Sequence, residues 1–193
     1  ARAGESWQAA REYGLRCLMA GAGFASVVSG AGGRVTPAAV KQVSPGHEAC
    51  ATWTAEAWAR QAADRGGGGV ALDLPAIQAL AAKGLEAPGT RGDAAQSQAT
   101  LGLALALTPG PLLRADGRDE RERARKALQA AIDLAPARPL PRVDLAQFVL
   151  LPSGQSEAAR RLLEGVLAQP VALDAPPGDG WARQRAASLL GSM

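Results

Sequence analysis

The chain has 193 residues, of which 47% are apolar and only 4% are aromatic, so it can bury a substantial core and is not expected to be disordered. Its net charge of +3 is modest, and its basic residues alternate with carboxylates, as in residues 119–126, which excludes the basic stripe of a nucleic-acid-binding protein. Alanine, leucine and arginine dominate while β-branched residues are sparse, so the composition predicts a single all-α domain over residues 1–193.

The first quarter of the chain alternates between regular and irregular patterns. Apolar residues at helical spacing predict an amphipathic helix over 5–20 and a second strong helix over 47–65. Between them, the glycine-rich segment 21–46 is expected to be irregular, with only an apolar turn at 24–28 and a short helix capped by Thr36.

Two cysteines, Cys17 and Cys50, lie on these two predicted helices. An even count allows one disulfide in an oxidising compartment. Each cysteine lies among alanine, leucine or tryptophan, and unpaired cysteine is among the most often buried residue types. We therefore favour two buried thiols and keep the disulfide as the alternative.

The middle of the chain contains a glycine run and two helical segments. Residues 66–69 are four glycines that lead into Val-Ala-Leu-Asp rather than the Gly-Lys-Ser or Gly-Lys-Thr of a phosphate-binding loop, which predicts a flexible turn. A helix is predicted over 74–87, with Asp73 as its cap. The next, over 93–107, is apolar all round at its end and should be central, although its run is far shorter than the ~20 residues needed to span a bilayer.

A helical motif recurs in the last third of the chain. Helices are predicted over 118–134, 141–150, 155–168 and 177–190, after a turn-rich loop at 108–117. Their small, large, small and proline positions repeat after 34 residues: Ala124, Leu128, Ala131 and Pro136 are followed by Ala158, Leu162, Gly165 and Pro170. This is the period of a tetratricopeptide (TPR) repeat. We expect about eight helices in antiparallel TPR-like helix-turn-helix pairs that form a short superhelical array.

Few residues point to chemistry. His47 and Cys50 could share a helix face, but no further cysteine, histidine or paired carboxylate completes a zinc site or a catalytic set, so neither a metal, a cofactor nor an enzymatic activity is predicted. Arg142 and Asp144 are ionisable residues in an otherwise apolar helix, which indicates either an ion pair that locks two helices or part of a polar site.

The four tryptophans, Trp7, Trp53, Trp58 and Trp181, are expected mainly in the core, with Trp181 the most exposed. The candidates for a ligand groove or a partner contact are Trp53, Trp58, Arg142, Asp144 and Trp181.

An ordered series of blocks resembles the TatT family, the T component associated with tripartite ATP-independent periplasmic (TRAP) transporters. The blocks lie at 33–37, 50–59, 71–75, 101–107, 127–136, 140–146, 161–168 and 182–190. The chain differs from the family in lacking a lipobox cysteine and in having Gln-Phe-Val-Leu-Leu-Pro-Ser-Gly at 147–154, where a tyrosine-rich acidic segment is usual.

The resemblance implies a periplasmic accessory protein, often lipid-anchored through a cysteine upstream of the mature chain, that acts beside the solute-binding P component of a TRAP transporter. It also implies a trimer and passage of a small hydrophobic ligand. One alternative is a general TPR-type adaptor for another partner in the cell envelope, and another is a small enzyme that uses His47 with Cys50 or Asp144.

Overall fold

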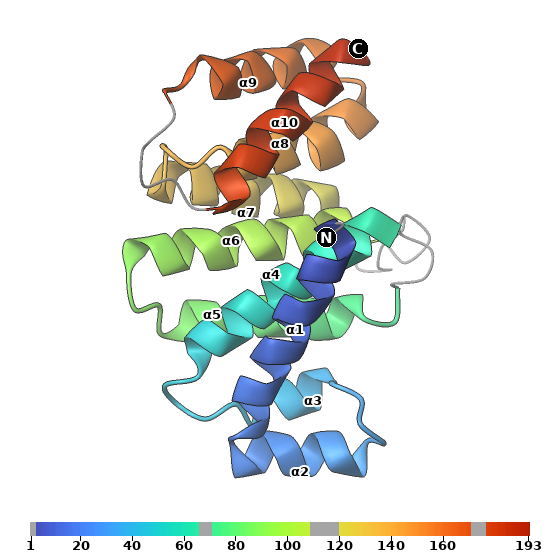
Figure 1. Cartoon of the computed structure of the whole chain (residues 1–193), viewed down its shortest axis with the longest axis vertical. Coiled ribbons are helices and arrows are strands. Elements are labelled where there is room, and N and C mark those ends of the chain that lie inside the picture. Colours follow the sequence, from blue (N-terminus) through green and yellow to red (C-terminus); the bar gives the residue numbers. More distant parts are fainter. Residues whose placement is uncertain (1–2, 66–70, 109–119, 171–176) are drawn as a thin grey trace.

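The chain forms an elongated stack of helices (Figure 1). The computed structural model describes residues 3–65, 71–108, 120–170 and 177–193, and within these ranges it contains helices and no strand, which confirms the all-α prediction. The α-helices are α1 (Ala3–Met19), α2 (Ala22–Gly30), α3 (Pro37–Val40), α4 (Glu48–Arg65), α5 (Leu74–Glu86), α6 (Arg91–Ala106), α7 (Glu120–Leu134), α8 (Leu140–Asp144), α9 (Ser156–Ala168) and α10 (Pro177–Gly191). A π-helical segment η3 (Leu145–Leu150) and a 3₁₀ turn η4 (Leu151–Ser153) follow α8 directly. The described helices therefore exceed the expected eight.

Most of the excess comes from the segment that was expected to be irregular. The predicted turn at 24–28 is wrong, because these residues lie inside the nine-residue helix α2. Phe24 and Val28 are four residues apart, so they share one face of α2, and both are buried. Burial of this face outweighs the low helix propensity of the neighbouring glycines. The cap of the next helix is confirmed, since the backbone N–H of Ala39 donates to Thr36 Oγ1 at 3.2 Å.

Two apolar clusters lie along the stack, and α6 contributes to both. The first cluster collects buried residues of α1 to α6, and the second collects those of α6 to α10. Leu103 and Ala104 belong to the first cluster, whereas Leu105 belongs to the second. This confirms the prediction that the all-round apolar helix is central. It begins two residues earlier than predicted because Thr90 caps it, with the Asp93 N–H donating to Thr90 Oγ1 at 3.1 Å.

The contact between α6 and α7 is close at a glycine. A Cβ added to Gly102 would lie 2.6 Å from Leu128 Cγ and 3.1 Å from the Ala124 carbonyl oxygen. Only a residue without a side chain lets the two helices approach to this distance. The small residue Gly102 therefore sets the spacing of this pair.

The repeat of buried positions is offset by one residue from the predicted period. In α7 the fully buried residues Ala124, Leu128 and Ala131 form one face. In α9 the corresponding face consists of Ala159, Leu163 and Val166, each 35 positions later, while Ala158 and Leu162 are only partly buried and Gly165 is exposed. A π-helical turn takes one residue more than an α-helical turn, so η3 shifts the following face by one position. The predicted 34-residue register is therefore wrong for α9.

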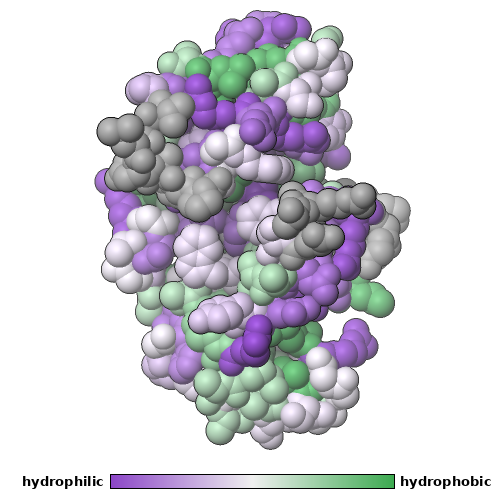
Figure 2. Space-filling view, viewed as in Figure 1, coloured by the Kyte–Doolittle hydropathy of each residue, from purple (hydrophilic) through white to green (hydrophobic). Residues whose placement is uncertain are grey.

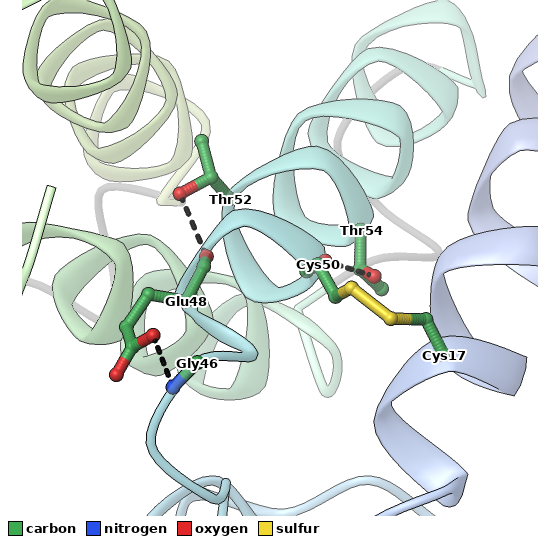
Figure 3. The surroundings of a disulfide bond; sticks show 6 residues. All are labelled: Cys17, Gly46, Glu48, Cys50, Thr52 and Thr54. Atoms are coloured by element: carbon green, nitrogen blue, oxygen red, sulfur yellow. Dashed lines mark hydrogen bonds between the residues drawn. A yellow bond between two sulfur atoms is a disulfide. The ribbon is translucent and has the colours of Figure 1, made fainter. Parts of the chain in front are cut away.

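The two cysteines form a disulfide, so the prediction of two buried thiols is wrong (Figure 3). Cys17 from α1 and Cys50 from α4 are 33 residues apart in the sequence and lie at a close contact between the two helices. Beside it, Thr54 Oγ1 donates to the Cys50 carbonyl at 2.6 Å, and a Cβ on Gly14 would collide with that hydroxyl. Local patterning could not reveal this pairing, because it depends on how α1 packs against α4.

The face shown in Figure 2 is mixed, with hydrophilic and hydrophobic side chains interspersed and a group of weakly hydrophobic ones at the end formed by α2 and α3. No helix among the residues described is long and apolar enough to cross a bilayer. The predicted glycine turn at 66–69 lies outside the described residues, as does most of the predicted loop at 108–117.

Candidate functional site

A buried arginine stands at the centre of the molecule. Arg60 lies on α4, and only 2% of its surface is exposed. Its Nε donates to Glu56 Oε1, one helical turn earlier, at 2.7 Å, and Glu56 is buried as well. Because a buried charge is costly unless it is paired and hydrogen-bonded, this position requires further partners.

The second partner of this arginine comes from the other half of the chain. Asp144 is the last residue of α8 and is fully buried. Its Oδ1 and Oδ2 each accept a hydrogen bond of 2.6 Å from Arg60, through Nη1 and Nη2 respectively, across 84 residues of sequence. This two-pronged geometry is the strongest form of an arginine–carboxylate contact. It joins α4 of the first cluster to α8 of the second.

A threonine on α6 completes the cluster. The hydroxyl of Thr100 lies 2.6 Å from Glu56 Oε2 and 2.9 Å from the carbonyl oxygen of Gln96, to either of which it can donate. All four carboxylate oxygens of Glu56 and Asp144 then have a donor within reach. A fully satisfied network of this kind fixes the relative position of three helices.

The charges of the cluster do not balance. One guanidinium faces two carboxylates, so the buried group carries a net charge of −1 when all three are ionised. Burial raises the pKa of Asp144 above its ordinary value of 3.8, Arg60 opposes this through its charge and hydrogen bonds, and the charge of Glu56 adds to it. Burial lowers the pKa of Arg60, but the two carboxylates more than compensate and raise it, so the arginine stays protonated.

A cleft with a volume of about 340 Å³ opens above this cluster. Its walls come from the last turn of α4, from η3 and from α10, and they are formed by Arg60, Ala63, Asp64, Gln147, Phe148, Trp181 and Arg185. Phe148 packs against the first apolar cluster and Trp181 against the second, so the cleft lies where the two clusters meet. Such junctions are common places for ligand sites.

Two contacts shape the walls of the cleft. The guanidinium carbon of Arg60 lies 5.6 Å from the centre of the Trp181 ring, within the range of a cation–π interaction. On the next turn of α10, Arg185 Nε donates to Gln147 Oε1 at 2.9 Å. The π-helical turn that carries Gln147 is a feature often found at functional sites.

The predicted ion pair between Arg142 and Asp144 does not form. Two residues apart on a helix, their side chains point in different directions, and Asp144 faces Arg60 instead. Arg142 Nη1 donates to the carbonyl oxygen of Pro136 at 2.6 Å, so it closes the turn before α8. The expectation that Asp144 locks two helices together is confirmed with a different partner.

The predicted tryptophans are not gathered in one groove. Trp181 lines the cleft but is only half-buried, whereas Trp53 is 54% exposed, so the expectation that Trp181 is the most exposed is wrong. Trp58 is buried, and its Nε1 donates to Asp73 Oδ2 at 3.1 Å. This contact also explains why Asp73 does not cap α5 through its side chain.

The sequence interpretation missed Arg60 and Arg185. A signal for Arg60 was present, because it lies four residues after Glu56 on a helix that is otherwise lined with alanine and tryptophan. Cys50 has no free thiol beside His47, since its sulfur is in the disulfide. Within the ranges that the structure covers, no group of three or more metal-ligating side chains is found.

The comparisons with known proteins assign no family: no protein-family model matches this chain, and no curated protein matches it. The structural features that bear on function are the helical stack, the disulfide and the cleft above the buried cluster.

Proposed function

We propose that this protein is a non-enzymatic accessory protein of a TRAP-type transporter in the periplasm, where it serves as a scaffold for the solute-binding component. We further propose that it binds a small ligand with a hydrophobic part. The link to the transporter is carried by the resemblance of the sequence blocks to the TatT family, and the physical observations below are consistent with such a role.

The observation that most supports scaffolding is the stack of consecutive helices with one shared central helix. Stacked helix pairs in the TPR style present long surfaces to a protein partner, and such proteins act by binding rather than by chemistry. Trp53 offers an anchor on this surface, because more than half of this large side chain is exposed. Tryptophan is enriched among residues that dominate binding energy at interfaces.

The disulfide supports location outside the reducing cytosol. Disulfides persist in the periplasm and other oxidising compartments and are rare where glutathione and thioredoxin keep thiols reduced. The bond between Cys17 and Cys50 therefore fits an exported protein. Anchoring through an upstream lipid-modified cysteine is part of the same proposal.

The test is a cross-linked pull-down from periplasmic extract of the source organism, with the captured proteins identified by mass spectrometry. Capture of a TRAP solute-binding component as the dominant partner is the expected result. Capture of a different envelope protein in its place would overturn the transporter role and favour a general TPR-type adaptor.

A matched pair of variants makes the pull-down specific to one surface. Trp53→Ala should reduce capture at least tenfold, because it removes an exposed aromatic anchor. Leu167→Ala, at an exposed position on α9 in the other cluster, should leave capture unchanged. If both variants capture the solute-binding component equally well, Trp53 is not part of the surface that contacts it.

The trimer implied by the resemblance is part of the proposal as well. Light scattering on the purified protein should give the mass of three chains of 19.7 kDa each. A monomer at concentrations well above those in the cell would contradict it.

A further inference from the structure

We propose that the cleft between α4, η3 and α10 binds a small monocarboxylate with a flat apolar part, held by Arg185 and Gln147. The inference names a ligand class for the ligand-binding part of the proposed function. It does not depend on the transporter partner, because binding to the isolated protein tests it directly.

The available hydrogen-bonding groups of the cleft are mainly donors. Arg185 uses only its Nε, on Gln147 Oε1, and its two terminal nitrogens have no partner among the described residues. The amide nitrogen of Gln147 likewise makes no hydrogen bond within the described part of the chain. Planar guanidinium and amide donors match the two oxygens of a carboxylate.

The carboxylates beneath the cleft do not compete with a ligand for the donors of Arg185 and Gln147. Glu56 and Asp144 are buried, and each of their oxygens is already hydrogen-bonded to Arg60 or Thr100. Of the charged residues that line the cleft, Arg60 is already offset by Glu56 and Asp144, so the charged groups left to meet a ligand are Arg185 and the exposed Asp64. A single ligand carboxylate can pair with the terminal nitrogens of Arg185, whereas a second would be repelled by Asp64 and by the buried carboxylates.

The remaining walls suit an apolar, flat group. Phe148 and Trp181 come from opposite sides of the junction between the two apolar clusters, and Ala63 adds a small apolar surface between the charged residues. Aromatic rings favour offset or edge-to-face contact with another ring. The volume of about 340 Å³ corresponds to roughly ten water molecules, which is enough for an aromatic acid of similar size.

The buried cluster of Arg60, Glu56 and Asp144 fixes the position of η3, which forms one wall of the cleft. Arg60 holds Asp144 at the start of η3, and η3 in turn carries Gln147 and Phe148. The floor of the cleft is thus rigid before the ligand arrives, which lowers the entropic cost of binding.

The probe is 3-phenylpropionate, with 3-phenylpropionamide as its neutral control of the same size and shape. Calorimetry or ligand-observed NMR on the oxidised full chain should give a Kd of about 4 mM or tighter for the acid, on the order expected for a ligand of about ten non-hydrogen atoms. The amide should bind at least tenfold more weakly. Equal affinity for acid and amide, or no binding of the acid at about 10 mM, would overturn the proposal.

A second comparison assigns the binding to this cleft. Arg185→Gln should weaken 3-phenylpropionate at least tenfold, because it removes the terminal donors. Arg161→Gln removes the same charge from the exposed surface of α9, outside this cleft, and should leave the Kd unchanged. An equal loss in both variants would show attraction to net charge and contradict a built site. Circular dichroism of each variant verifies that the helices remain folded.

Discussion

The two apolar clusters differ in how their helices are held together. In the first cluster, a disulfide joins α1 to α4, and a buried hydrogen bond of 2.8 Å between Thr52 and Ser97 joins α4 to α6. In the second cluster, α7, α8 and α9 pack mainly through apolar faces. Arg183 of α10 donates hydrogen bonds to carbonyl oxygens at the end of α9. The first cluster thus has a covalent link between two of its helices. The second combines repeated apolar faces with noncovalent pairs made by α10, such as Arg138 with Asp179 and Arg185 with Gln147.

The buried ion cluster belongs to neither half. Arg60 and Glu56 come from α4 in the first cluster, and Asp144 comes from the second. A buried ion pair often adds little net stability compared with apolar residues of the same shape, but losing one partner is costly. We therefore expect a large loss of stability when the ion cluster between the two halves is broken, and smaller losses from substitutions within each half.

The largest loss of stability is expected when the buried ion cluster loses its arginine. Arg60→Met should lower the free energy of unfolding by about 3–5 kcal/mol, because it leaves two buried carboxylates without a cation. Urea denaturation followed by circular dichroism measures this loss. Arg161→Met, which changes an exposed arginine, should stay within about 0.5 kcal/mol of the native chain.

A double variant tests whether charge is the cause of this loss. Adding Asp144→Asn to Arg60→Met removes one of the two uncompensated charges and should recover part of the stability. If the double variant is no more stable than Arg60→Met alone, the loss does not come from unpaired charge.

The second largest loss of stability is expected from removal of the disulfide in the first cluster. Replacing Cys17 and Cys50 together by serine should cost about 2–4 kcal/mol, because the bond closes a loop of 33 residues in the unfolded chain. Reductant should lower the unfolding midpoint of the native chain and leave the double variant unaffected.

Hydrogen exchange then separates the two halves in this variant. Amides of α1 should lose protection, whereas those of α9, in the other cluster, should keep it. Equal loss of protection in α1 and α9 would show that the two clusters unfold as one unit.

Two helical glycines, one at a close helix contact and one exposed, give a smaller contrast in stability. Gly102→Ala should destabilise the chain by about 1–3 kcal/mol, because the added Cβ would press on Leu128. Gly165→Ala should stabilise it by roughly 0.5–1 kcal/mol, since it lies on a helix with nothing within 4 Å of an added Cβ. Thermal unfolding of the two variants measures both; a loss at Gly165 would restore the 34-residue register that the structure contradicts.

The smallest effect is a pH dependence from Asp144. Its pKa is raised above 3.8 in the folded state, so at intermediate pH the folded protein binds a proton that the unfolded chain has released. The stability contributed by Asp144 is fully present below about pH 3.8, the ordinary pKa of an aspartate. It is lost as the pH rises through the higher pKa that Asp144 has in the folded protein. The native chain should therefore lose stability over this interval relative to Asp144→Asn, in denaturant titrations at a series of pH values. Parallel pH profiles for the two proteins would contradict the raised pKa.

Features that depend on neighbouring residues could be predicted from the sequence, whereas features that depend on contacts between distant segments could not. The Thr36 cap and the central position of the helix that contains Leu103 were predicted, because a cap spans three residues and an all-round apolar helix is visible in its own composition. The helix α2 was missed because its glycine content is a local signal for a loop, and only the packing of Phe24 and Val28 overrides it. Of the site, the sequence identified Asp144 and Trp181 but paired Asp144 with the wrong arginine.

The helical class and most helix positions could be predicted from the residues alone, since both depend on periodicity and composition within a short stretch. The pairs of groups that meet across the fold could not be predicted: Cys17 with Cys50, Arg60 with Asp144, and Arg185 with Gln147. These partners are separated by 33, 84 and 38 residues respectively. Contacts at such separations follow from the way whole helices pack, and the extra residue in the π-turn of η3 shifts by one the positions of α9 that are buried.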